Sequence, residues 1–239
     1  MKSIGVFGDS YTGQADGPSA KYHWSTLLAN HYDCEMKNYG TGGSSIYFSY
    51  KQFLENHHKH DLNIFLVTEI GRYIKPVTLY SGQQIYIPSI SVLDQTKDDI
   101  YSHKQEDLRG WFMASDETYN NDMAYLMLEK IYSISNDTIF MPCFGNWLSK
   151  EIKENILEKD VIDFWNLYTY QAKLFGFDPF ELVNNYTENN LVISGHLVPD
   201  IHKLVCEKII NRIDTGIWES NMPDSIELKY AFNEAFIKN

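Results

Sequence analysis

Cysteine is scarce in this 239-residue chain, which contains only Cys34, Cys143 and Cys206. They are odd in number and widely spaced, without a Cys-x-x-Cys pair, which argues against a disulfide framework or a thiolate metal site. We therefore expect three buried thiols in a reducing, cytoplasmic compartment.

Long hydrophobic runs and positive charge are also scarce. No run of eighteen apolar residues occurs, and the chain opens on a short strand, so we expect neither membrane insertion nor export. With 20 Lys and Arg against 32 Asp and Glu, the net charge is −12. This charge argues against nucleic-acid binding and favours neutral substrates over acidic ones. The histidines at 57, 58 and 60 predict a solvated helix end rather than a metal site.

What the chain has in quantity is apolar sequence, 44% of its residues, arranged in alternating strands and helices. The alternation predicts an α/β fold: a three-layer α/β/α sandwich with a mainly parallel, flavodoxin-like sheet, in one domain over residues 1–239. Predicted strands cover 4–7, the region of residue 36, 62–68 and 138–144; predicted helices cover 24–31, 45–57, 116–134, 150–157, 161–174 and 199–213.

Two segments stand outside the alternation. Residues 73–115 form a predicted insertion that contains a hairpin at 82–88, and a tail begins at about residue 215. An insertion of this length is often a lid or an oligomer contact. The tail is expected either to wrap around the domain or to dock on a partner. Four aromatic residues of the insertion either contact a sugar or pack the insertion onto the domain. They are Tyr80, Tyr86, Tyr101 and Trp111.

The first strand ends at Gly8, which is followed by Asp9 and Ser10. In an α/β sheet, the carboxyl ends of the strands are where ligands bind. A glycine there permits a tight turn that displays the serine hydroxyl, and it places the Asp9 carboxylate at the same site. The segment predicts either a displayed nucleophile or an ordinary turn, since all three residue types are common in turns.

Two further segments lead to the same edge. The glycine-rich turn at 38–45 precedes a predicted helix, and its exposed backbone N–H groups are suited to stabilising an oxyanion. The strand at 64–68 ends in polar residues, among which Thr68 and Arg72 are candidate donors.

His196 lies in a loop just before the last predicted helix, which begins at Pro199. A histidine at this position can approach a serine at a neighbouring strand end and accept its proton.

Together these residues resemble the SGNH hydrolases, also called GDSL-type esterases, over nearly the whole chain. Residues 8–10 match the block with the nucleophile, whose own backbone N–H is one oxyanion donor. Asn38 and Gly43 match the block with a second N–H donor, and His196 matches the catalytic base. The resemblance implies a serine esterase that needs no cofactor and acts on O-acetylated carbohydrates or small acyl esters.

The chain departs from the family pattern in its third block, which normally offers an asparagine as oxyanion donor. Residues 67–70 contain none, so the hydroxyl of Thr68 or the guanidinium of Arg72 is expected to replace it. A Thr-x-x-x-Arg pattern here is similar to a divergent branch associated with viral genomes, which would make the protein virion-associated.

A second departure concerns the acid of the triad. The family acid stands three residues before the histidine, where this chain has Ile193. Either a backbone carbonyl orients the imidazole of a Ser–His dyad, which we favour, or Asp200 or Glu188 supplies the carboxylate. His202, in place of a family Gly-His pair, is expected to pack or cap within the helix.

Two alternatives keep the same fold class. In one, the missing asparagine and acid mark a weak or inactive protein that binds or assembles rather than catalyses. In the other, residues 10–15 resemble the phosphate loop of flavodoxins, which would imply an FMN cofactor.

Overall fold

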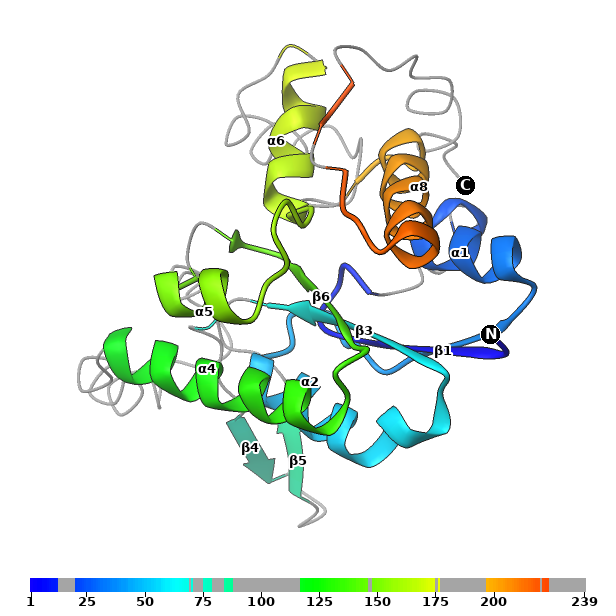
Figure 1. Ribbon diagram of the computed structural model, residues 1–239. Coiled ribbons are helices and arrows are strands. Elements are labelled where there is room, and N and C mark those ends of the chain that lie inside the picture. Colours follow the sequence, from blue (N-terminus) through cyan, green and yellow to red (C-terminus); the bar gives the residue numbers. More distant parts are fainter. Residues whose placement is uncertain are drawn as a thin grey trace.

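A parallel sheet of four strands forms the centre of the protein in the computed structural model (Figure 1). Its order is β2 (Glu35–Asn38), β1 (Ser3–Phe7), β3 (Leu62–Val67) and β6 (Ile139–Pro142). Every neighbouring pair is parallel. The described residues are 1–12, 20–68, 70, 75–78, 84–87, 117–145, 148–174, 176, 197–219 and 221–223, with backbone alone for 75–78, 84–87, 117 and 118.

Helices cover both faces of this sheet, as Figure 1 shows. On one face lie α1 (Trp24–Tyr32), α6 (Phe164–Leu174) and α8 (Pro199–Thr215); on the other lie α2 (Ile46–Asn56), α4 (Glu117–Ile134) and α5 (Lys150–Asn155). The predicted three-layer α/β/α sandwich with a parallel sheet is therefore confirmed.

Alternation along each strand divides the core into two halves. In β3, Ile64 and Leu66 pack with the helices of the first face, whereas Phe65 and Val67 pack with those of the second. Such strands are mostly apolar because both faces are covered, and β3 has a single polar residue, Asn63. This explains why 62–67 could be recognised as a buried strand from its sequence.

The ends of the helices are set by capping groups. The Ser45 and Ser149 side chains accept hydrogen bonds from the first turns of α2 and α5. Helix α6 begins at Phe164, later than the predicted residue 161, because Asp163 accepts the Trp165 N–H and starts the helix there.

Two short strands form an antiparallel hairpin, β4 (Lys75–Thr78) with β5 (Gln84–Ile87). The segment 82–88, predicted as a whole hairpin, contains only the second strand, β5. The first strand, β4, precedes it in the chain. Two short 3-10 turns complete the described elements, η1 (Ala20–Tyr22) and η2 (His57–Lys59).

The histidine group lies at the end of α2, as the sequence predicted: His57 is the C-cap residue and His58 is exposed. The ring of His57 stacks on Phe53 with centroids 4.8 Å apart, and His60 is hydrogen-bonded to the Tyr39 hydroxyl at 2.9 Å. Two of the three imidazoles, those of His57 and His60, are thus half-buried against aromatic rings, which the sequence did not indicate.

The cysteines are free thiols, and two of them, Cys143 and Cys206, are buried as predicted. Burial raises the pKa of Cys206 to about 12. Cys34 is only half-buried.

The beginning of the tail packs on the domain. Trp218 is buried, and Lys208 of α8 donates to the backbone carbonyls of Glu219 and Asn221 at 2.7 and 2.8 Å. Within the described residues no helix is long and apolar enough to cross a bilayer.

Candidate active site

The carboxyl ends of β1, β3 and β6 meet around the carboxylate of Asp9, which is fully buried. Its Oδ1 accepts the Tyr11 N–H at 3.1 Å and faces the Cys143 thiol at 3.6 Å, and its Oδ2 accepts the Thr68 hydroxyl at 3.0 Å. A buried carboxylate is stabilised by such donors. Asp9 therefore ties the turn after β1 to the ends of two other strands.

The turn itself requires glycine at position 8, where φ is 151°. A Cβ added to Gly8 would lie 2.6 Å from Cβ of Leu66, closer than carbon atoms approach. After the glycine, both the N–H and the hydroxyl of Thr12 donate to the Asp9 carbonyl, at 3.1 and 2.6 Å. Ser10 is half-buried within this closed turn, so its position is fixed by the backbone on both sides.

The glycine-rich turn after β2 packs directly on the serine turn. A Cβ added to Gly40 would lie 1.7 Å from Oγ1 of Thr12 and 2.9 Å from the Gly8 carbonyl oxygen, so the two turns meet at a distance that only glycine allows. The Thr41 N–H and the Ser44 hydroxyl both donate to the Gly8 carbonyl, at 3.2 and 2.7 Å. The two turns therefore form one rigid unit.

Within this unit one glycine, Gly42, lies beside Ser10, and Gly43 follows it. A Cβ on Gly42 would come 3.9 Å from Cβ of Ser10, and Gly43 has a φ of 70°, which favours glycine. The structure thus brings together three of the sequence-predicted site residues: Asp9, Ser10 and Gly43.

Thr68, the fourth predicted residue within the described part, holds the two turns together. Its hydroxyl lies 3.0 Å from Oδ2 of Asp9 and 3.2 Å from the Ser44 carbonyl. Both partners are acceptors, and a hydroxyl has a single proton to donate. In this arrangement, Thr68 positions Asp9 and the glycine-rich turn.

The expected base and the expected guanidinium, His196 and Arg72, lie outside the described residues, as do Ile193 and Glu188. The chain becomes described again at Leu197.

Leu197 and Val198 are buried in the same core cluster as Tyr11. The Val198 N–H donates to the Gln171 side chain at 2.7 Å. The residue after Ser10 and the residue after His196 therefore belong to one packed core. Asp200 is buried in the first turn of α8.

His202 lies in α8, where its ring centroid is 4.5 Å from that of His23. His23 is itself buried and hydrogen-bonded to the Ser25 hydroxyl at 2.7 Å. The contact fits the expected packing role for His202.

Sequence reasoning missed a second buried carboxylate at this edge, Asp163. It accepts the N–H groups of Gly145 and Trp165, each at 2.7 Å, and burial raises its pKa despite these donors. A Cβ on Gly145 would lie 2.1 Å from Oδ2 of Asp163. Aspartate directly before an amphipathic helix is a recognisable N-cap pattern, so this residue was predictable. Asp163 fixes the loop after β6 to α6.

Comparison with known proteins finds no family model that matches the chain and no curated protein that matches its sequence. In structure the chain is similar to a psychrotrophic esterase from a Pseudoalteromonas species, with 13% identity, 90% of this chain and 98% of that chain covered, and a TM-score of 0.46. An acetyl xylan esterase has 14% identity, 88% and 99% coverage, and a TM-score of 0.48. A member of the lipolytic protein G-D-S-L family from Veillonella parvula has 12% identity, 90% and 100% coverage, and a TM-score of 0.38.

These structures are esterases and lipolytic proteins, and they include a member of the family that the sequence motifs resemble. The identities are low, so the activity proposed below rests on the chain's own residues. The association with a viral branch stays a prediction.

Proposed function

We propose that the protein is a serine hydrolase that cleaves acyl esters through an acyl-enzyme. The observation that carries the proposal is the contact between the two turns, which sets Ser10 beside Gly42, directly before Gly43. A serine displayed after a parallel strand, next to a glycine-rich turn, combines a nucleophile with backbone donors for an oxyanion.

In the proposed first step, the Ser10 oxygen attacks the ester carbonyl carbon while His196 takes the hydroxyl proton. The carbonyl π electrons move to oxygen, where the N–H groups of Ser10 and Gly43 stabilise the negative charge. The tetrahedral intermediate collapses, the alkoxy group leaves with the proton from His196, and an acyl-serine remains. Water then attacks the acyl-serine by the same route, releases the carboxylic acid and restores Ser10.

The structure of the turns supports Ser10 and Gly43 in these roles, whereas His196 comes from the sequence pattern. We favour a Ser–His dyad, because the family acid is replaced by Ile193. A carboxylate orients the histidine in complete triads, and its loss lowers rates by about 10⁴-fold. We therefore expect a weak or specialised enzyme.

For Thr68 the geometry supports a positioning role over oxyanion donation, because the acceptors Asp9 and Ser44 already surround its hydroxyl. Arg72 stays the candidate side-chain donor to the oxyanion.

The proposed substrates are O-acetylated carbohydrates or other small, neutral acyl esters, in line with the motif resemblance and the net charge of −12. Free thiols accord with a reducing, cytoplasmic location. We propose no nucleic-acid or membrane partner. The insertion at 73–115, most of which lies outside the described residues, is the proposed contact for a carbohydrate.

The flavodoxin alternative is disfavoured by the turn after β1. A phosphate loop presents its residues to the ligand, but Tyr11 and Thr12 are buried, at 5% and 0% exposure. The Thr12 hydroxyl already donates to the Asp9 carbonyl, and a buried carboxylate beside a phosphate would oppose binding.

The test is hydrolysis of p-nitrophenyl acetate by the wild type, Ser10→Ala and His196→Ala, together with labelling by a fluorophosphonate probe. We expect both variants to lose activity while keeping their folded circular dichroism spectra, and only Ser10→Ala to lose all labelling. A folded wild type that neither hydrolyses the ester nor reacts with the probe would contradict the proposal and favour the binding or assembly alternative.

A further inference from the structure

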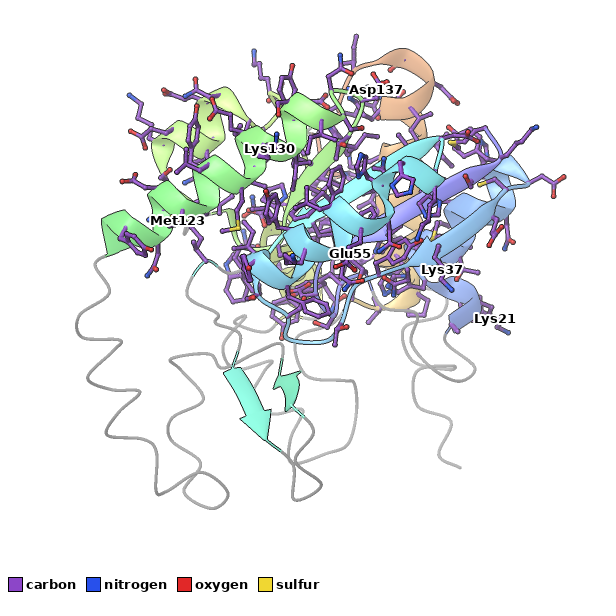
Figure 2. The ribbon with its side chains drawn as sticks, turned by 90° about the horizontal axis from the view of Figure 1, so that it is seen from below. Lys21, Lys37, Glu55, Met123, Lys130 and Asp137 are labelled. Carbon is purple, nitrogen blue, oxygen red and sulfur yellow. The ribbon has the colours of Figure 1, made fainter. Side chains whose placement is uncertain are left out.

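The solvent side of α4 carries an apolar stripe that the described part of the chain leaves exposed. Four of its residues are Tyr119, Met123, Leu126 and Ile134, with exposures of 58%, 39%, 55% and 37%. They follow one another at intervals of three, four or eight residues, so they share one face of the helix. Figure 2 views the layer that contains α2 and α4, with Met123 and Lys130 labelled along α4.

This stripe is not the face with which α4 packs on the domain. Ala124, Leu128 and Ile131 have no exposed surface and belong to the core cluster beneath the sheet. They lie on the opposite side of the helix from Leu126. A surface helix is usually apolar on one side and polar on the other. Helix α4 is apolar on both, which marks the outer stripe as a contact surface.

The stripe is complementary to itself in the antiparallel direction. Tyr119 and Ile134 lie equally far from a midpoint between Leu126 and Met127, and so do Met123 and Lys130. A second α4 laid antiparallel across this midpoint therefore sets Tyr119 of each copy against Ile134 of the other. This is the isologous contact of a two-fold dimer.

The charges on the helix agree with the same pairing. Lys130 is the only charged residue on the stripe, and in the antiparallel pair it comes level with Met123 of the second copy. The residue next to Met123 is Asp122, an exposed carboxylate within reach of that ammonium group. The pairing thus gives each lysine stem an apolar contact and each ammonium an opposite charge.

We propose that α4 is a homodimer interface, in which two copies pack antiparallel through Tyr119, Met123, Leu126 and Ile134. The proposal is independent of the esterase assignment. It differs from the expectation that an oligomer would form through the insertion or the tail.

The size of the stripe sets the affinity. Helix α4 has 18 residues and so is about 27 Å long. A specific interface normally buries about 800 Å² on each partner. One helix stripe lies at the low end of that range, so the dimer should have a Kd of about 1–100 µM. Because each copy has a charge of −12, salt should strengthen the association by screening repulsion.

The test is sedimentation velocity of the full chain from about 1 to about 300 µM. It compares the wild type with Leu126→Glu, at the centre of the stripe, and Tyr132→Glu. Tyr132 is the matched control for Leu126: it lies on the same helix and is similarly exposed, at 51%, but it is outside the stripe. We expect a concentration-dependent dimer in the wild type and in Tyr132→Glu, and a Kd at least about tenfold higher in Leu126→Glu. All three should melt at similar temperatures, since both substituted residues are exposed.

Three results would overturn the proposal: a monomer at every concentration, equal dimerisation of wild type and Leu126→Glu, or equal weakening in both variants. The register has its own test in chains carrying Cys34→Ser. A mixture of Tyr119→Cys and Ile134→Cys chains should form an intermolecular disulfide under mild oxidation, while neither variant alone should do so. Intermolecular disulfides between two Tyr119→Cys chains, or between two Ile134→Cys chains, would contradict the antiparallel arrangement.

Discussion

At the scale of single residues, the turn that carries Ser10 depends on how closely it approaches the glycine-rich turn. Gly40 leaves no room for a side chain, because a Cβ there would lie 1.7 Å from Oγ1 of Thr12. Gly42, two residues later, has only Cβ of Ser10 within 4 Å, at 3.9 Å. The two glycines therefore form a matched pair: Gly40 is required for the close approach of the two turns, and Gly42 lies beside Ser10, the proposed nucleophile.

We predict that Gly40→Ala lowers the free energy of unfolding by about 1–3 kcal/mol or more, the usual cost of overpacking. Gly42→Ala should change it by less than about 0.5 kcal/mol, as surface substitutions do. Urea denaturation measures both. Adding Thr12→Ala to Gly40→Ala should restore part of the loss, because it removes the atom in conflict. Equal stability of the two glycine variants would contradict the close approach.

A second residue-scale prediction separates positioning from catalysis at Thr68. Thr68→Val removes the hydroxyl and leaves Oδ2 of Asp9 without this donor, which should cost about 1–3 kcal/mol of stability. Thr68→Ser keeps the hydroxyl and should recover most of it.

Activity on p-nitrophenyl acetate distinguishes the two roles. A direct oxyanion donor is worth about 10²–10³ in kcat with little effect on folding. A positioning residue instead moves stability and activity together, and the serine variant rescues both. A large loss of kcat in Thr68→Val at unchanged stability would assign Thr68 to the oxyanion hole.

At the scale of elements, the sequence predicted the layers well, because each strand and helix carries its own pattern. Residues 62–67 are apolar apart from Asn63, as expected of a strand covered on both faces, and Ser45 and Pro199 mark helix starts by residue type alone. The tight turns at Gly8 and Gly43 were also predictable, since a turn at a strand end favours glycine.

Contacts between distant elements were not predictable in this way. The hydrogen bond from Thr68 to Asp9 joins residues 59 positions apart, and the thiol of Cys143 reaches Asp9 across 134 positions. Such partners depend on sheet order and register, which the local pattern does not encode. The sequence therefore placed the candidate site at the sheet edge but gave Thr68 a different task.

One contact between elements is sensitive to pH. His60, after η2, is bonded through Nε2 to the Tyr39 hydroxyl, and Tyr39 precedes the glycine-rich turn. The Nδ1 atom of His60 is buried and has no hydrogen-bond partner among the residues described. Burial lowers the pKa of His60; nearby Glu35 and Asp61 oppose this shift, and Lys59 and His58 reinforce it.

A lowered pKa means that the unfolded chain takes up the proton first. His60 is neutral in both states at high pH, and below about pH 6.5 the unfolded state binds more protons. We therefore predict that wild-type stability falls as pH drops from about 7 to about 5, and that His60→Gln falls less. The loss of unfolding free energy between these pH values should differ between the wild type and His60→Gln by less than about 1 kcal/mol, because the ring is only half-buried. Parallel urea-denaturation curves against pH measure it, and identical slopes would show that His60 makes no contribution.

At the scale of the whole molecule, the candidate site at Ser10 belongs to a chain with a net charge of −12. A field of one sign repels ligands of the same sign as they approach, and salt screens that field over about 10 Å at 0.1 M. The proposed chemistry at Ser10 involves the ester carbonyl alone, so it does not itself distinguish a neutral ester from an anionic one. Any preference between them should therefore arise from the field and should depend on salt.

We predict that kcat/KM for p-nitrophenyl acetate changes little between about 0.02 and about 0.3 M NaCl, whereas kcat/KM for p-nitrophenyl hemisuccinate rises by at least about twofold. The ratio of the two values at each salt concentration cancels any general effect of salt on the enzyme. Repeating the series with potassium fluoride controls for specific binding of chloride. An anionic ester that is hydrolysed equally well at all salt concentrations would show that the surface charge does not act at the site, and preference for an acidic substrate at low salt would point to Arg72 or another local cation as the stronger influence.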